Sequence, residues 1–260
     1  MTENESATWK YISRTLCEVE RSGTQAIDRA LGLLRVFETA ESDLGITALA
    51  AASNLSLSTT HRLVKALVAA GLVAQDPETE RYHLGASLVT LGRRAEARLG
   101  FERWNVILDG LARSTGESAS LGVRVGPHVL IAAHVPSAQA LRFDAGVGSR
   151  VPIHASAMGK MLLAMTDDPE AEVASLGELE RFTDRTLSDP AALVADLEAS
   201  RERGWSLNDG ERHDGVRAIA VMVANASGLP PSAVAVQGPA LRLTDDRLDA
   251  VADELRAAVA

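Results

Sequence analysis

The sequence predicts an α+β protein built from two domains. The chain has 260 residues, which is long for one compact domain and sufficient for two. Residues 24–85 carry helical patterns that end in a short pair of strand patterns, whereas residues 118–260 mix strand-like and helical segments. A mixture of the second kind is typical of one sheet with helices packed against it.

The N-terminal domain is expected to span residues 23–85, after a loose arm at residues 1–22. Thr24 is placed to cap a first helix in QAIDRALGLLRVFET, and Thr47 is placed to cap a second, shorter helix in ALAAASN. Apolar residues at helical spacing predict the buried stripe of the first helix, which consists of Ile27, Ala30, Leu31, Leu34 and Phe37.

The segment LSLSTTHRLVKALVAAGLVAQ predicts a third helix, from about Ser58 to Ala70, with a stop at Gly71. One face should pack on the core, through Thr60, Leu63, Val64, Leu67 and Ala70. The opposite face carries Ser58, Arg62, Lys65 and Ala69. LVAQ and RYHL, separated by the turn DPETE, predict a β-hairpin. Three helices followed by a two-stranded wing describe a winged helix-turn-helix.

Charge is distributed unevenly along the chain. The net charge of −9, taken alone, argues against nucleic-acid binding. Residues 1–95 are nearly neutral, however, and no acidic residue occurs from Leu44 to Gln75. Binding to DNA requires local positive potential rather than a basic protein as a whole. Such a gap also arises by chance in an alanine-rich chain, so it supports DNA binding only together with the helix pattern.

A helix that enters a DNA major groove needs short or polar side chains at its N-terminal end. Ser58, Thr59 and Thr60 would allow close approach, and the basic side chains after them would reach phosphates or guanine edges. The candidate DNA-contacting residues are Gln25, Arg29, Thr47, Ser58, Thr59, Thr60, His61, Arg62, Lys65 and, on the wing, Arg81. The alternatives are an ordinary surface helix and a winged domain that binds another protein.

The second half of the chain begins after a connecting helix. GASLVTLGRRAEARLG predicts this linker, expected over residues 86–101. In residues 102–260, strand patterns such as SASLGVRV, HVLIAAHV and VRAIAVMVAN alternate with helical patterns such as ASAMGKMLLAM. TDDRLDAVADELRAAVA closes the chain as an amphipathic helix, with Thr244 as its N-cap.

Several classes of function find no support in the sequence. Ser156, His154 and Asp209 do not form a credible nucleophilic triad, because no G-x-S-x-G turn exposes the serine. The six histidines lack metal-binding spacing, and no glycine-rich segment is a P-loop or dinucleotide motif. The single cysteine, Cys17, excludes an internal disulfide. We therefore expect no enzymatic activity, no catalytic residue, no cofactor and no metal.

No apolar run is long enough to span a bilayer, so no membrane partner is expected. The first residues also lack the apolar run and cleavage site of a secretory signal. These features predict a cytoplasmic protein.

Segments in both halves resemble the IclR-type family of bacterial transcriptional regulators. The first three are TQAIDRALGLLRVFE, ITALAAASNLSLSTTHRLVKALVAAGLV and RYHLGASLVTLG. VPIHASAMGKMLLA and GERHDGVRAIAVMV…AVAVQGP follow in the order typical of the family. The resemblance implies a winged helix-turn-helix, a linker helix, and a GAF-like effector-binding and oligomerisation domain with a mainly antiparallel six-stranded sheet. It also implies a homodimer, or a dimer of dimers, on double-stranded DNA.

The resemblance further implies an effector pocket. The start of the helix in VPIHASAMGK would bind an anion through backbone N–H groups, and His154, Ser156 and Lys160 lie beside it. The expected effector-binding residues are Leu141, Phe143, His154, Ala157, Met158, Asp209, Ala218, Ala235 and Gln237. In the alternative interpretation, Ser156 caps the helix, a hydrogen bond holds His154 in the fold, and Asp209 belongs to a turn.

The sequence departs from some family members in this pocket. Those members carry hydroxyl or thiol side chains near the positions of Ala218, Ala235 and Gln237, and two of these three residues are alanine here. A larger, more apolar pocket is therefore expected. Its effector would be an organic acid with an aromatic or aliphatic body and one polar end.

Together these observations predict a regulator that binds a pseudo-palindromic operator and responds to a small organic acid. Repression of a catabolic operon, relieved by the effector, is the expected mode. Ligand-dependent activation is the alternative.

Overall fold

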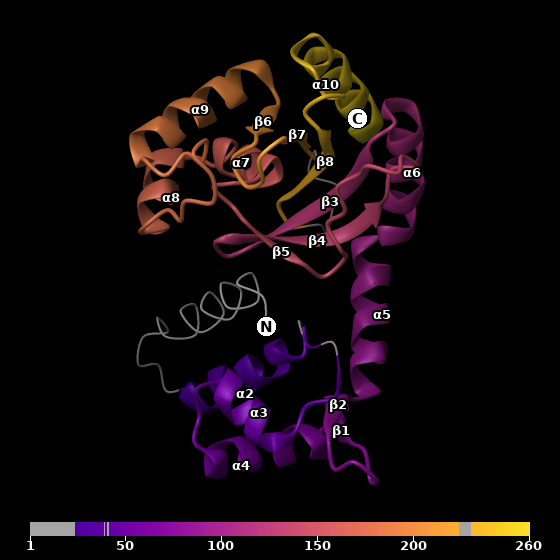
Figure 1. Cartoon of the computed structure of the whole chain (residues 1–260), viewed down its shortest axis with the longest axis vertical. Coiled ribbons are helices and arrows are strands. Elements are labelled where there is room, and N and C mark those ends of the chain that lie inside the picture. Colours follow the sequence, from indigo (N-terminus) through magenta and orange to yellow (C-terminus); the bar gives the residue numbers. More distant parts are fainter. Residues whose placement is uncertain (1–23, 39, 41, 224–229) are drawn as a thin grey trace. The chain divides into compact units, whose positions relative to one another are not determined.

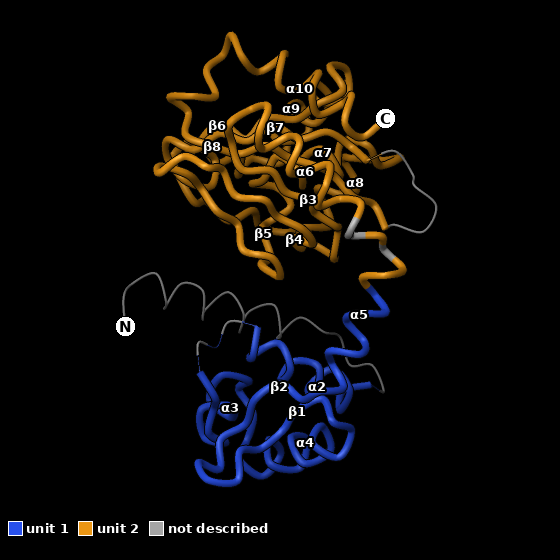
Figure 2. The backbone as a smooth tube through the Cα atoms, turned by 90° about the vertical axis from the view of Figure 1, so that its right-hand side faces the viewer, with its two compact units in different colours: residues 1–95 blue, residues 96–260 orange. Residues whose placement is uncertain are grey.

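The computed structural model describes residues 24–38, 40, 42–223 and 230–260. The expected N-terminal arm and Cys17 lie outside these residues. The chain divides into two compact units, residues 1–95 and 96–260, which are coloured separately in Figure 2. The division falls within helix α5 (Ser87–Leu99), in the segment expected to be the linker.

The first unit is a three-helix domain with a hairpin. It consists of α2 (Gln25–Val36), α3 (Ile46–Ala52), α4 (Leu57–Ala69) and the antiparallel pair β1 (Val73–Gln75) and β2 (Tyr82–Leu84) (Figure 1). Its core contains buried side chains from all five elements: Leu33, Val36, Phe37, Leu49, Ala52, Val64, Leu67, Val73 and Tyr82. The winged helix-turn-helix predicted from the residue pattern is therefore present.

The buried stripe of α2 agrees with the prediction only in part: Phe37 is buried, and Ala30 and Leu34 are partly buried against the core. Ile27 and Leu31 are 59% and 50% exposed, whereas Leu33 and Val36 are buried. The sequence of α2 offers two overlapping apolar series, and packing against α3 and α4 buries members of both. Thr24 does precede the helix, but its side chain makes no capping bond to a helix N–H and donates to the Asp28 carboxylate at 3.2 Å.

Helices α3 and α4 do not begin at the residues predicted from the sequence. Gly45 occupies the cap position of α3, so Thr47 lies within the first turn and is not the cap. Helix α4 begins one residue earlier than predicted, because the Ser56 Oγ accepts a hydrogen bond from the Thr59 N–H. Ala70, expected on the core face, is exposed.

Helix α4 ends at the predicted glycine. Gly71 adopts φ of +70°, the left-handed conformation that favours glycine. The Leu72 N–H donates to the Leu67 carbonyl at 3.0 Å, and the Gly71 N–H donates to the Val68 carbonyl at 2.9 Å. These two bonds form a Schellman motif, which satisfies the last carbonyls of the helix.

The end of α4 is joined directly to the start of α5. The Gly85 N–H donates to the Leu72 carbonyl at 2.8 Å, and the Ser87 N–H donates to the Gly71 carbonyl at 3.2 Å. A Cβ on Gly85 would lie 2.1 Å from the Gly71 carbonyl oxygen, so only glycine permits this approach. We call this contact between residues 71–72 and 85–87 the α4–α5 joint.

The second unit is built on a six-stranded antiparallel sheet with the order β5-β4-β3-β8-β7-β6. The strands are β3 (Ser118–Val125), β4 (His128–Val135), β5 (Arg150–Pro152), β6 (Ser206–Asp209), β7 (Val216–Met222) and β8 (Ser232–Pro239). This is the sheet that the family resemblance implied.

Helices cover both faces of this sheet. On one face, α6 (Phe101–Thr115) and α10 (Asp245–Val259) pack against residues that include Leu121, Val234 and Val236. On the other, α7 (Ala157–Ala164), α8 (Pro169–Ser175) and α9 (Pro190–Arg203) pack against residues that include Ile131, Ala233 and Ala235. Neighbouring residues of β8 thus serve opposite cores, as strand alternation requires.

Helix α7 contains a buried lysine, Lys160. Lys160 is 1% exposed, and its Nζ lies 2.5 Å from Glu211 Oε1 and 2.9 Å from Asp196 Oδ2. These contacts join α7 to α9 and to the segment that follows β6. Burial raises the pKa of the Glu211 carboxyl above its ordinary value, although Lys160 opposes that effect.

In the portion of the chain that the structure describes, no helix combines the length and apolar character needed to cross a membrane.

Candidate functional site

Helix α4 presents a polar face that is free of acidic side chains. Ser58, His61, Arg62 and Lys65 are exposed, and Thr59 is half-buried. Ser58, Arg62 and Lys65 are spaced by four and three residues, which places them on one side of a helix. Among the described residues, no acidic side chain forms an ion pair with Arg62 or Lys65. Both cations are therefore available to bind phosphate.

Thr60 cannot contact DNA from this helix, and its prediction was wrong. Its side chain is fully buried, and Oγ1 donates to the Ser56 carbonyl at 3.0 Å. In the sequence, Thr60 belongs both to the cluster of hydroxyl residues and to the face of the helix predicted to pack on the core. In the structure it packs on the core.

The other expected DNA-contacting residues are exposed on neighbouring elements. Gln25 and Arg29 lie on α2, and Thr47 lies in the first turn of α3. Arg81 precedes β2, and its Nη1 donates to the Asp43 carbonyl at 3.0 Å. Arg81 thus helps to attach the wing to the segment before α3.

The turn at the tip of the wing is acidic, in contrast to the basic face of α4. Asp76, Glu78 and Glu80 occupy the turn and are not buried, and the Asp76 carboxylate accepts bonds from the Glu78 and Thr79 N–H groups. Hydrogen bonds from Thr79 hold the pKa of Asp76 below its ordinary value. An ionised tip would be repelled by a phosphate backbone, so α4 is the better candidate for contact.

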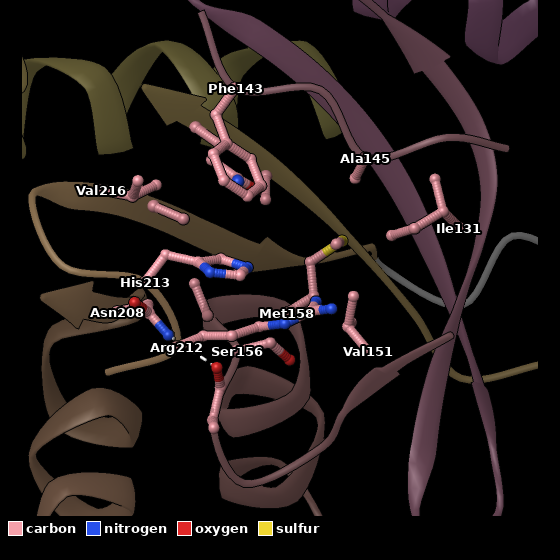
Figure 3. A pocket seen from close by; sticks show the side chains of 15 residues that line it. Ile131, Phe143, Ala145, Val151, Ser156, Met158, Asn208, Arg212, His213 and Val216 are labelled. Carbon is pink, nitrogen blue, oxygen red and sulfur yellow. Dashed lines mark hydrogen bonds between the residues drawn. The ribbon is translucent and has the colours of Figure 1, made fainter. Parts of the chain in front are cut away.

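The second unit contains a pocket between the sheet and the start of α7 (Figure 3). The hollow, with its open mouth included, measures about 490 Å³. Ten of its fifteen lining residues are apolar: Ile131, Phe143, Ala145, Val151, Ala155, Ala157, Met158, Val216, Ala218 and Ala235. The other five are Ser156, Asn208, Arg212, His213 and Gln237. A mainly apolar hollow with few polar groups is typical of small-molecule sites.

Capping fixes the start of α7 at this pocket. Ser156 is the N-cap, and its Oγ accepts a bond from the Gly159 N–H at 3.1 Å. The Asn208 Nδ2 donates to the Ala155 carbonyl at 2.7 Å, so β6 holds the segment before the helix. The interpretation of Ser156 as a helix cap is confirmed.

Six of the nine expected effector-binding residues line the pocket. They are Phe143, Ala157, Met158, Ala218, Ala235 and Gln237. Leu141, His154 and Asp209 are not among the lining residues, and their assignment to the pocket needs correction.

Each of these three residues has a structural role or an exposed position. Leu141 is 65% exposed, and its carbonyl accepts a bond from Arg242. His154 is buried and bonded through Nε2 to the Glu180 carbonyl at 3.0 Å, and burial lowers its pKa below the ordinary value. Asp209 binds Arg217 at 2.5 Å and Arg185 at 2.6 Å, and the bond from Arg217 is the main cause that lowers its pKa.

Sequence reasoning missed Arg212 and His213. Both belong to the loop of residues 210–215, which the order of β6 and β7 brings to the pocket. The His213 ring lies 4.8 Å from the Phe143 ring, between centroids. Burial, followed by the charge of Arg212, lowers the pKa of His213 below its ordinary value. The only sequence signal was the sequence GERHDG itself, which is equally typical of an exposed turn.

Comparison with known families decides the identity of this two-unit arrangement. The model of the IclR helix-turn-helix domain matches residues 26–77, and the model of the bacterial transcriptional regulator IclR C-terminal domain matches residues 101–260. The chain belongs to the IclR family. It is therefore a DNA-binding transcriptional regulator and not an enzyme.

Individual relatives are similar over most of their length. The glycerol operon regulatory protein of Streptomyces griseus is 36% identical over 239 residues, which cover 90% of this chain and 92% of the relative. The transcriptional repressor AllR of Salmonella paratyphi A is 31% identical over 229 residues, which cover 87% of this chain and 84% of the repressor. The solved structure of an IclR-family regulator from Silicibacter sp. TM1040 is 26% identical, covers 90% of this chain and 93% of its own, and gives a TM-score of 0.80.

Proposed function

We propose that this IclR-family protein represses a catabolic operon in the cytoplasm and releases its operator when an organic acid binds the pocket of the second unit. Ligand-dependent activation of the same operon is the second candidate. The observation that carries the proposal is the pairing of an exposed, acid-free α4 with a mainly apolar pocket. The names of two similar proteins, a glycerol operon regulator and a repressor, support the mode of action.

The exposed face of α4 supports direct contact with DNA. Ser58 is short enough for close approach to the groove, and Arg62 and Lys65 can bind phosphate or guanine. The cap bond to the Thr59 N–H holds the first turn of the helix in place. Gln25, Arg29, Thr47 and Arg81 would add contacts around this helix.

Exposed apolar side chains support a homodimer. Ile27 and Leu31 on α2, and Val89 and Leu91 on α5, are each at least half exposed. Ile27 and Leu31 are neighbours on one side of α2, and exposed apolar side chains that lie together are typical of association surfaces. Two copies related by a two-fold axis would read a pseudo-palindromic operator, and two such dimers would give a dimer of dimers.

Helix α5 would connect the effector to the operator. An effector changes the DNA affinity only by its differential affinity for two arrangements of the dimer. The α4–α5 joint would transmit a change in α5 directly to α4.

Fluorescence anisotropy on DNA from upstream of the gene itself would test DNA binding at physiological salt, with a shuffled duplex as the control. We expect a preference of about a thousandfold or more for the operator, the low end of typical specificity ratios. Organic acids can then be screened for release of the same duplex. Equal, weak binding to both duplexes, with and without acids, would contradict the proposal.

A further inference from the structure

A long loop, residues 136–149, joins β4 to β5 and borders the effector pocket. In its second half the side chains alternate. Phe143 and Ala145 are half-buried and line the pocket, whereas the residues at 142, 144 and 146 are exposed. We call residues 142–147 the Phe143 segment. The loop of residues 210–215 borders the same pocket through Arg212 and His213.

Phe143 and His213 meet at the solvent side of the pocket. Their ring centroids lie 4.8 Å apart, and the two side chains point toward one another in Figure 3. His213 is exposed, whereas Met158 and Ala235, which also line the pocket, are buried. The ring contact therefore lies at the mouth, where a ligand would enter.

The loop that carries His213 is held by the core of the second unit. The Glu211 carboxylate lies 2.5 Å from the Nζ of the buried Lys160, and the Glu211 carbonyl accepts a bond from Thr186 Oγ1 at 2.6 Å. Backbone hydrogen bonds of 2.9 Å and 2.8 Å join the two ends of the loop to the start of β7 and to the residue after β8. The His213 side of the mouth is therefore fixed in place.

The Phe143 segment is attached less firmly. Within the described ranges of the chain, residues 142–145 form no hydrogen bond from backbone to backbone. The Asp144 side chain provides the attachment, because its Oδ1 lies 3.4 Å from both His134 Nε2 and Ser118 Oγ, at the long end of hydrogen-bond distances. Its Oδ2 accepts a bond from Arg142, in the same segment, at 2.8 Å. The Asp144 side chain is 42% exposed, so water competes for these contacts.

Both flanks of the Phe143 segment are anchored. Before it, the Leu141 carbonyl accepts a bond from Arg242 Nη2 at 2.8 Å, and Arg242 is itself paired with a buried glutamate. After it, the Gly148 N–H donates to the Ile131 carbonyl at 2.8 Å. Movement would therefore be confined to the few residues between these two points.

We propose that the Phe143 segment is a gate to the effector pocket. It opens by moving Phe143 away from the fixed His213, and the contacts of Asp144 hold it closed. This inference rests on the proposed effector function and deepens it, because it specifies how a ligand enters and leaves the same pocket. A segment with few backbone hydrogen bonds opens at a lower free energy than the sheet beside it. The alternative is a mouth that is permanently open, with no role for Asp144.

The reactivity of a thiol inside the pocket measures opening without any effector or DNA. Ala235→Cys places this reporter at a buried position that lines the pocket, in a Cys17→Ser chain that has no other cysteine. Ala252→Cys, in the core on the other face of the sheet, is the reference reporter. The probe is methyl methanethiosulfonate, a small uncharged reagent, and mass spectrometry measures the rate of modification.

Asp144→Ala removes the contacts that hold the gate closed. It should raise the rate at the Ala235→Cys reporter about three- to tenfold, the range expected for the loss of a modest hydrogen bond. Phe143→Ala should also raise the rate, and adding Asp144→Ala to it should have little further effect. Asp109→Ala on α6 is the matched control, because Asp109 is likewise an exposed carboxylate paired with an arginine, and it should leave the rate unchanged. The rate at Ala252→Cys should be the same in all of these proteins.

Three results would overturn the gate. The first is an equal rate at the pocket thiol with and without Asp144→Ala. The second is an equal acceleration at both reporters, which would indicate general loosening of the domain. The third is a pocket thiol that reacts as fast as free cysteine in the parent chain, because the mouth would then be open already. Each would leave the proposed effector function intact, since release of operator DNA tests that function independently. Circular dichroism would establish folding, and Ala218→Cys on the neighbouring strand provides the reporter if Ala235→Cys does not fold.

Discussion

Individual residues in this protein illustrate how one side chain can match two patterns. Thr60 belongs both to the hydroxyl cluster at the start of α4 and to its core face, and the structure buries it completely. His154 and Asp209 are close in sequence to residues that line the pocket. His154 is instead hydrogen-bonded to the Glu180 carbonyl, and Asp209 forms two ion pairs. Sequence reasoning identified the right residue types, but the partner of each polar group is known only once the chain is folded.

His154 should make the stability of the protein depend on pH. Burial lowers the pKa of its imidazole below the ordinary value of 6.5, so the unfolded chain takes up a proton more readily. The stabilisation is present above about pH 6.5 and decreases as the pH falls through the lower, folded-state pKa. Thermal unfolding between pH 7.5 and 5.5 should show a decline that is smaller in His154→Gln. An equal decline in both proteins would assign the dependence to another group.

Lys160 should be far more sensitive to substitution than an exposed lysine. Lys160→Met would leave Glu211 and Asp196 without the cation that now lies within 2.9 Å of both. We expect a loss of about 3–5 kcal/mol in the free energy of unfolding, measured in urea, because a buried charge without its partner is costly. The double variant Lys160→Met with Glu211→Gln should recover part of this loss. No recovery would show that packing, rather than charge, dominates at this position.

At the level of elements, local signals were reliable where the chemistry is local. The glycine stop of α4 and the hairpin of the wing were both predicted, because turn residues and strand alternation determine them. The buried face of α2 was predicted only in part, because two apolar series overlap there and only the neighbouring helices determine which residues are buried. The pocket residues Arg212 and His213 depend on the sheet order, which a single sequence does not reveal.

The cap of α4 can be tested with two nearby serines, Ser56 and Ser58. Ser56→Ala removes the bond to the Thr59 N–H and should destabilise the first unit by about 1 kcal/mol. Ser58→Ala, two residues later, should preserve stability and instead weaken DNA binding. Hydrogen exchange of the α4 amides reports the first effect, and anisotropy reports the second. Equal protection of α4 in both variants would contradict the role of Ser56.

For the whole molecule, the distribution of charge is more informative than its sum. A protein of net charge −9 can still bind DNA through one helix that has no acidic side chain. The acidic turn of the wing and the acidic second half would limit retention on nonspecific DNA.

Replacing both Arg62 and Lys65 by alanine should therefore abolish specific binding and reduce its salt dependence. Each lost phosphate contact lowers the slope of log affinity against log salt by about 0.9. The matched control replaces Arg113 and Arg256, which removes the same charge from side chains paired with Asp109 and Asp253. Anisotropy titrations at several salt concentrations measure both slopes. An unchanged slope in the first variant would move the DNA contact to another surface.

The α4–α5 joint has a consequence for engineering. Gly71 and Gly85 meet backbone to backbone, and two backbone hydrogen bonds hold the end of α4 against the start of α5. A hybrid regulator can combine the DNA-binding domain of one relative with the effector-binding domain of another. Its fusion point should lie inside α5, beyond Ser87. A cut at Gly85 would fall within the α4–α5 joint. The hybrid should then lose the coupling between its effector-binding domain and α4.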